Sequence, residues 1–255
     1  MKKILIRSSF ALIIVVILGV VAIGLFLDGA IKRGVETVGP MLTKVEVKVD
    51  SVNLSLLSGA GKIKGLLIGN PPGYKTPSAI QVGNASLAIA PGSVFSSKVI
   101  IRSINVQAPE ITFETDLREN NLSKILANLQ AVAGGNGSGS AAADSKASKK
   151  LQVDDFLISG GKVHVSLSVL GGQSATVPLP EIHLTALGQG PDGITAAELT
   201  KLVFQAVEKE AVQVAASAAG NLSKDAANMT KGLGNSATGA AGSVTKGIGG
   251  LFKKN

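Results

Sequence analysis

The chain has 255 residues, enough for one or two domains with a buried core, and a formal net charge of +8 at neutral pH. Only 3% of the residues are aromatic, with one Tyr and no Trp, which argues against nucleic-acid binding by base stacking. Because the sequence has no cysteine, disulfides and thiolate metal sites are excluded.

The most apolar stretch lies near the start of the chain. Residues 10–27 carry no charge and, as a helix, would span roughly 27 Å, close to the hydrocarbon thickness of a bilayer. Residues 1–9 carry three basic side chains, so the positive-inside rule places them in the cytoplasm and everything after Asp28 on the other side. We therefore expect a single-pass anchor at 10–27. The alternative is a cleaved signal peptide with its small-residue site at 22–24.

The apolar period changes directly after this run. Residues 28–44 repeat apolar side chains every three to four positions, which predicts an amphipathic helical stalk with its last turn broken at Pro40. From Val45 the period is two, which predicts strands, and the first strand skips at Asp50–Ser51, which indicates a bulge. The predicted strands cover residues 45–56, 63–68, 79–89, 99–106, 111–113, 151–159, 163–167, 175–179 and 182–187.

The domain predicted over residues 45–190 also contains a helix and a linker, and a second helix follows it. Asn121 is the expected N-cap of a helix that runs to about residue 129. Residues 134–150 are Gly, Ser and Ala with a few lysines, which predicts a flexible linker. A helix over 194–214 is predicted to begin with a capping box of Thr195 and Glu198. Its expected sheet-facing stripe is Leu199, Leu202, Val203, Ala206, Val207 and Ala211.

Residues 215–255 form a basic tail rich in Gly and Ala, with no acid after Asp225. Apolar side chains recur eleven apart, which predicts an extended helix that forms only on an anionic membrane surface. The alternative is a disordered tail with chance spacing, because its many glycines disfavour a helix. The expected membrane-contacting residues are Leu222, Lys231, Leu233, Val244, Lys246, Ile248, Phe252, Lys253 and Lys254.

A weak internal repeat links the two halves of the strand region. Each unit is a strand, a two-residue break and a second strand, and the breaks Ala108–Pro109 and Gly160–Gly161 align. The alignment pairs Ile104 with Phe156, Val106 with Ile158, Ile111 with Val163 and Phe113 with Val165. The sequence therefore predicts a mainly β fold with flanking helices (α+β): a transmembrane helix, an elongated, curved antiparallel sheet of strand–turn–strand repeats, and a helical C-terminal region.

Residues for catalysis are sparse. His164 and His183 lie in strand patterns without a partner at metal-ligand spacing, and Asp154 and Asp155, adjacent in a strand, point to opposite faces. A hydrolase would need the two histidines to converge beside a Ser or a carboxylate. We expect no enzyme activity, no cofactor and no metal site.

Several stretches resemble the AsmA-like envelope proteins of bacteria. They are the N-terminal anchor, residues 52–59, 69–74 and 101–114, and the strand–Gly–strand repeat at 155–163. The resemblance runs from the anchor to about Val207 and does not include the tail. It implies an inner-membrane anchor, a periplasmic sheet with an apolar groove, and a part in outer-membrane assembly or phospholipid movement. This sheet is much shorter than in the larger AsmA and TamB relatives, which favours a modulating or scaffolding role over lipid conduction.

The resemblance also implies which residues would contact lipid, namely inward-facing apolar side chains of the strands. These are Ile63, Leu67, Ile80, Val82, Ile101, Ile111, Phe113, Val163 and Val165, each of which also fits an ordinary core. Expected partners are membrane lipids, then other envelope proteins or a second copy, and no nucleic acid. The alternative function is a non-catalytic structural or stress-protective envelope protein whose tail binds membrane surfaces.

Overall fold

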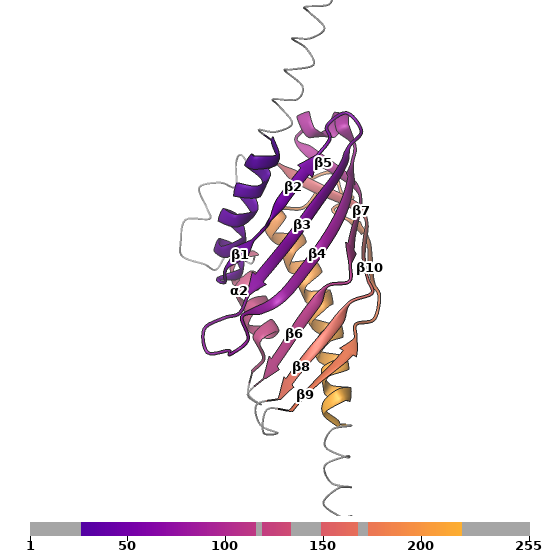
Figure 1. Cartoon of the computed structure of the whole chain (residues 1–255). Helices are drawn as coiled ribbons and strands as arrows, with labels where there is room; N and C mark the ends of the chain where they lie inside the picture. Colours follow the sequence, from indigo (N-terminus) through magenta and orange to yellow (C-terminus); the bar gives the residue numbers. More distant parts are fainter. Residues whose placement is uncertain (1–26, 116–118, 134–148, 168–172, 221–255) are drawn as a thin grey trace, which may run out of the picture. The chain divides into compact units, whose positions relative to one another are not determined.

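The computed structural model describes residues 27–115, 119–133, 149–167 and 173–220 (Figure 1). The chain divides into two units, residues 1–214 and 215–255, and the sheet belongs to the first. The anchor expected at 10–27 lies outside the described residues except for Leu27, and so do all nine residues expected to contact membrane in the tail. No helix in the described part of the chain is both long and apolar enough to cross a bilayer.

Ten strands of the described residues form a single curled sheet, so the predicted α+β class is confirmed. The strands are β1 (Val47–Lys48), β2 (Ser51–Leu54), β3 (Ala60–Gly69), β4 (Ser78–Ile89), β5 (Lys98–Gln107), β6 (Glu110–Thr115), β7 (Lys150–Ser159), β8 (Lys162–Leu167), β9 (Gln173–Pro178) and β10 (Ile182–Leu187). The helices cover residues 27–43, η1 (Pro91–Phe95), α2 (Asn121–Ala133) and residues 196–220.

Most of these strands are halves of longer ones. β4 pairs with β3 along one side, and along the other side it pairs first with β6 and then with β5. β7 and β8 lie beside β5 and β6 in turn, and β10 and β9 close the far edge against β7 and β8. Each pair of halves therefore behaves as one long, interrupted strand.

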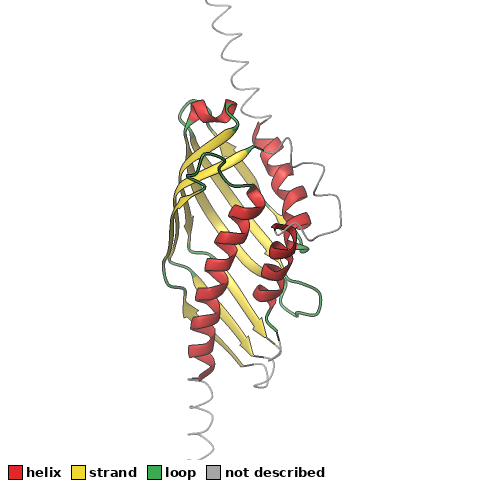
Figure 2. Ribbon diagram, turned by 180° about the vertical axis from the view of Figure 1, so that it is seen from behind, coloured by secondary structure: helices red, strands yellow, loops and turns green. Residues whose placement is uncertain are grey.

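The sheet is mixed, and the prediction of a purely antiparallel sheet is wrong. β5 runs parallel to β7, and β6 runs parallel to β8. The reason is the connection from β6 to β7, which contains α2 and returns the chain to the end of the sheet where β5 began (Figure 1). The helices lie on one face of the sheet (Figure 2). The four residue pairs aligned by the internal repeat are direct neighbours in this parallel ladder, so the repeat describes two strands lying side by side.

A line of interruptions crosses the whole sheet at one level, and we call it the crease. Backbone hydrogen bonds join its members across strands, for example from Lys162 N–H to Pro109 O (2.9 Å) and from Leu179 N–H to Gly161 O (2.9 Å). The crease consists of Asp50, Gly65, Gly83, Ala108–Pro109, Gly160–Gly161 and Leu179–Glu181. The alternation slips at Asp50–Ser51 as predicted, with Val47, Val49 and Val52 buried. β1 and β2 nevertheless keep one register against β3, from Lys48↔Leu67 to Ser51↔Lys64, so the predicted bulge is not found there.

The crease changes which side chains point into the core. The buried residues of β7 are Val153, Phe156 and Ile158, and those of β8 are Val163 and Val165. The alternation therefore slips by one residue between Ile158 and Val163. An extra residue in a strand has this effect because side chains alternate with a period of two. With a slip at the same level in neighbouring strands, the buried face stays on the same side of the sheet.

The helix predicted over 28–44 forms at residues 27–43, and it packs on the domain. It lies along the edge formed by β1 and β2, and its side chains bond to backbone groups of that edge (Figure 1). Asp28 Oδ1 accepts from Leu54 N–H (2.7 Å), and Glu36 Oε1 accepts from Val49 N–H (3.2 Å). These contacts protect an edge that would otherwise be free to pair with another chain.

This helix also continues through Pro40, contrary to the predicted break. The last turn of the helix packs closely on β1, because a Cβ on Gly39 would lie 2.8 Å from Cβ of Val47. Thr43 Oγ1 donates to Gly39 O (2.8 Å). The helix ends at Lys44, whose φ of 59° is left-handed and whose N–H bonds to Pro40 O (3.0 Å).

The helix that follows β10 begins as predicted. Glu198 N–H donates to Thr195 Oγ1 (3.1 Å), and Thr195 N–H donates back to Glu198 Oε2 (2.7 Å), so the capping box is confirmed. The predicted stripe is partly wrong because Leu202 is 36% exposed, whereas Phe204, absent from the prediction, is buried with Val207 and Ala211.

Candidate functional site

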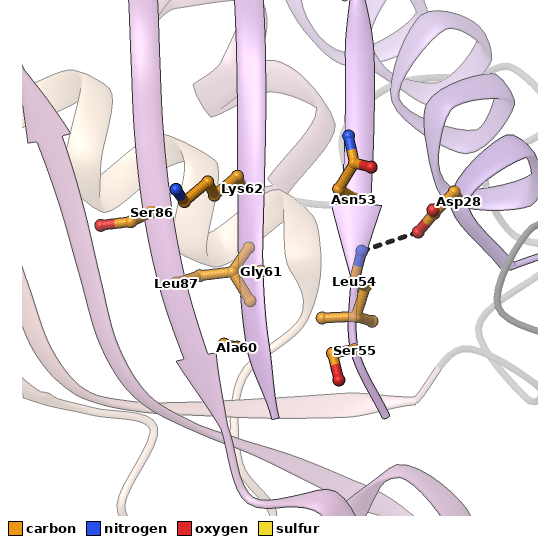
Figure 3. A pocket seen from close by; sticks show the side chains of 9 residues that line it. All are labelled: Asp28, Asn53, Leu54, Ser55, Ala60, Gly61, Lys62, Ser86 and Leu87. Carbon is orange, nitrogen blue, oxygen red and sulfur yellow. Dashed lines mark hydrogen bonds between the residues drawn. The ribbon is translucent and has the colours of Figure 1, made fainter. Parts of the chain in front are cut away.

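An open pocket of about 450 Å³ lies where the start of the 27–43 helix meets β2, β3 and β4 (Figure 3). The hydrogen bond from Leu54 N–H to the carboxylate of Asp28 holds the helix at its rim. The lining residues are Asp28, Asn53, Leu54, Ser55, Ala60, Gly61, Lys62, Ser86 and Leu87. The pocket therefore belongs to the end of the domain where the apolar run 10–27 joins it.

The apolar wall of the pocket depends on a glycine. Leu54, Gly61 and Leu87 are register partners on three adjacent strands. A Cβ on Gly61 would lie 2.8 Å from Leu87 Cδ1 and 3.0 Å from Leu54 Cδ1, so the two leucine side chains converge over the glycine. The next row of partners is polar, with Asn53, Lys62 and Ser86. Because side chains alternate along a strand, this polar row points to the opposite face of the sheet from the leucines. The apolar wall by itself suits an alkyl chain.

The residues expected to contact lipid lie elsewhere in the sheet. Six of them are at most 8% exposed and are packed in the core, namely Ile80, Val82, Ile111, Phe113, Val163 and Val165. Ile63, Leu67 and Ile101 are half-buried. None of the nine lines the pocket. Strand alternation identifies inward-facing side chains but not which part of that face the helices leave open.

The pocket residues had only weak signals in the sequence. Leu54 belonged to a predicted strand, Leu87 to another, and Asp28 marked the end of the apolar run. Gly61 lay between the strands predicted over 45–56 and 63–68 but is instead a buried residue of β3. The close approach of these residues depends on strand register and on the position of the helix, neither of which periodicity specifies.

The two histidines are far apart and lie on different strands. His164 Nδ1 is 3.0 Å from Thr176 Oγ1, and His183 Nε2 is 2.5 Å from Asp155 Oδ1. His183 pairs with Leu157, seven residues before His164 along β7 and β8, which corresponds to roughly 20 Å. The convergence that a hydrolase would need is therefore not found. No group of three or more potential His or carboxylate metal ligands occurs among the described residues.

A buried carboxylate forms the centre of a second polar cluster. Glu114 on β6 is 4% exposed, and its carboxylate accepts hydrogen bonds from the N–H of Lys75 (2.9 Å), the N–H of Thr76 (3.0 Å) and the hydroxyl of Thr76 (2.8 Å). These bonds fix the loop between β3 and β4. We call this group, with Asn70 and Asn121, the Glu114 network.

Asn121 completes the Glu114 network, and its predicted role as an N-cap is wrong. Its amide donates to Asn70 Oδ1 (2.7 Å) and to Thr112 O (2.7 Å), and it is fully buried. The cap of α2 is the preceding residue, Asn120, whose Oδ1 accepts from Ser123 N–H (2.8 Å). The sequence indicated a helix cap at Asn121 but not its contact with Asn70 in the loop between β3 and β4.

The Glu114 network makes the loop sensitive to acid. Burial by itself would raise the pKa of Glu114, but the hydrogen bonds from Lys75 and Thr76 hold that pKa below its ordinary value of 4.5. A carboxyl with a lowered pKa stabilises the fold above its unfolded pKa, and this contribution is lost as the pH falls through the lower, folded value. Tyr74, the only tyrosine in a chain without tryptophan, adjoins Lys75 and reports on this loop.

We therefore expect the near-UV circular dichroism of Tyr74 to be constant from pH 7 to about 5 and to fall only at a pH below 4.5. The Glu114→Gln variant should lose this step, because its amide does not titrate. A step of the same size and midpoint in that variant would assign the transition to other carboxyl groups.

No known protein family matches the chain, and comparisons with curated proteins and with solved structures likewise give no match.

Proposed function

We propose that this chain is a non-enzymatic envelope protein, anchored in the bacterial inner membrane by residues 10–27, that binds a phospholipid acyl chain in its pocket. The observation that carries the proposal is the position of the pocket. Its leucine wall lies beside Asp28, the residue that directly follows the apolar run. A volume of about 450 Å³ is within the size range of small-ligand pockets.

The resemblance to AsmA-like proteins supports the same function. It implies a periplasmic domain with a part in phospholipid handling during outer-membrane biogenesis. Membrane lipids are the proposed partners, with other envelope proteins or a second copy as further candidates. The proposed lipid site differs from the nine strand residues first expected, because most of those side chains are packed in the core.

Photo-crosslinking of the full-length chain in vesicles tests lipid binding. A phospholipid with a photoreactive group in its acyl chain should modify the tryptic peptides 49–62 and 76–98, which contain Leu54 and Leu87. The variant Leu87→Asn should reduce adducts on both peptides about tenfold, because a polar amide replaces the apolar wall. Adducts on residues 8–32 report on the anchor and serve as the internal reference.

Leu66→Asn is the matched control, since Leu66 is a half-buried leucine of β3 that does not line the pocket. It should leave adducts on the two peptides unchanged. Adducts restricted to residues 8–32 in the wild-type chain would overturn lipid binding by the sheet and favour a structural or protective role. Absence of adducts on 8–32 would overturn the anchor itself.

A further inference from the structure

Two large apolar side chains at one end of the domain are almost fully exposed. Leu57 in the β2–β3 turn is 81% exposed, and Phe95 in η1 is 86% exposed. Among the described residues, the next most exposed large apolar side chain is Met41, at 54%. Single exposed apolar residues are common on protein surfaces, so their significance depends on where these two lie.

The β2–β3 turn and η1 are direct neighbours. Ile89 N–H, at the end of β4, donates to Gly59 O in the turn (2.7 Å). A Cβ on Gly59 would lie 3.3 Å from Pro91 Cδ, the first residue of η1. Leu57 and Phe95 therefore belong to two adjoining loops at the same end of the sheet (Figure 1).

The 27–43 helix begins at this same end. Asp28 is bonded to Leu54, three residues before Leu57 in the chain. The uncharged run 10–27 therefore enters the domain beside the two exposed side chains. If that run is in a bilayer, as the proposed function requires, this end of the domain is at the membrane surface.

Three lysine side chains lie near η1, at the end of the sheet that carries Phe95. Lys98 and Lys150 are register partners at the start of β5 and β7, and the ammonium of Lys149 donates to Val94 O in η1. Acids are present as well, namely Asp28 and Glu198, whose carboxylates accept from the N–H groups of Leu54 and Thr195. Asp192, in the loop before Thr195, is exposed. Apolar side chains with lysines beside them are typical of surfaces that sit in a membrane interface.

We infer that Leu57 and Phe95 insert into the headgroup–acyl boundary of the bilayer that holds the anchor, at a depth of about 5–10 Å. This inference rests on the proposed anchor. It gives the anchored domain a fixed orientation on the membrane. Ser55 and Ala60, on either side of the turn that carries Leu57, line the pocket. The pocket then opens at the lipid surface, and an acyl chain can enter it without crossing water.

Spin labelling of the full-length chain tests the inference. The chain has no cysteine, so Leu57→Cys, Phe95→Cys, Ser174→Cys and Val20→Cys each provide a unique label. The probes are oxygen, which concentrates in lipid, and a water-soluble nickel chelate, and the vesicles contain phosphatidylethanolamine and phosphatidylglycerol. Position 20 reports on the anchor. Position 174 is an exposed site on β9, a strand on the other side of the crease from Leu57, and serves as the control.

We expect labels at 57 and 95 to relax faster with oxygen than with the chelate, as at position 20, and the label at 174 to show the opposite order. Chelate-accessible labels at 57 and 95 with a lipid-exposed label at 20 would overturn the inference and leave the anchor intact. Chelate access at all four positions would overturn the anchor as well. Labels at 57 and 95 shielded from both probes would indicate a protein partner instead of lipid, and would also overturn the inference.

Discussion

Glu114→Ala is expected to lower the free energy of unfolding by about 3 kcal/mol, measured by urea denaturation of the full-length chain in micelles with far-UV circular dichroism. The carboxylate is buried and accepts bonds from both Lys75 and Thr76. Its removal leaves two backbone N–H groups without their acceptor in a site with little access to water. Each such group is costly to bury, and the loop they belong to also loses its attachment to β6.

Glu110→Ala is the matched control for this prediction. Glu110 is at the opposite end of the same strand and is exposed, with its carboxylate 3.9 Å from His164 Nε2. Surface pairs of this kind contribute little, so a change below about 0.5 kcal/mol is expected. Equal losses in the two variants would contradict a special role for the buried carboxylate.

Local sequence signals predicted individual elements well. The capping box of Thr195 and Glu198 forms as expected because its atoms are three residues apart and depend on little else. The internal repeat also predicted how distant strands pair. Its alignment of Ile111 with Val163 is the observed register of β6 and β8, because two parallel strands with the same break match only when the breaks lie side by side.

The crease could be predicted only in part. The slip at Asp50–Ser51 is visible in one strand because apolar side chains change parity there. That Gly65, Ala108 and Gly160 lie at the same level depends on pairing between distant segments. A single sequence contains no direct information about that pairing.

The sites were the least predictable features. Thr76 and Glu114 are 38 residues apart, and neither belongs to a recognised motif. The pocket was missed because a core side chain and a ligand-contacting side chain have the same apolar pattern. Burial separates Val163, which is fully enclosed, from Leu87, which is half-buried at the pocket.

Gly65→Ala is expected to destabilise the domain by about 3 kcal/mol, because it strains the crease in two ways. The φ of Gly65 is +62°, a left-handed conformation that L-residues adopt at a cost of about 1–2 kcal/mol. Its Cβ would also lie 1.9 Å from Oδ2 of Asp50, which lies over the glycine. Urea denaturation of the full-length chain, as for Glu114, measures the change.

Gly83→Ala is the matched control, because Gly83 faces Gly65 across the β3–β4 ladder but has open space around it and no left-handed φ. Replacing it should be neutral or stabilising by up to about 1 kcal/mol, since the unfolded chain loses freedom. The double variant Gly65→Ala, Asp50→Gly lacks the clash. It should recover the stability lost to the clash but not the stability lost to the left-handed φ. Equal stability of the Gly65→Ala and Gly83→Ala variants would show that the crease does not depend on Gly65. The other strands would then have to stabilise the change in side-chain alternation.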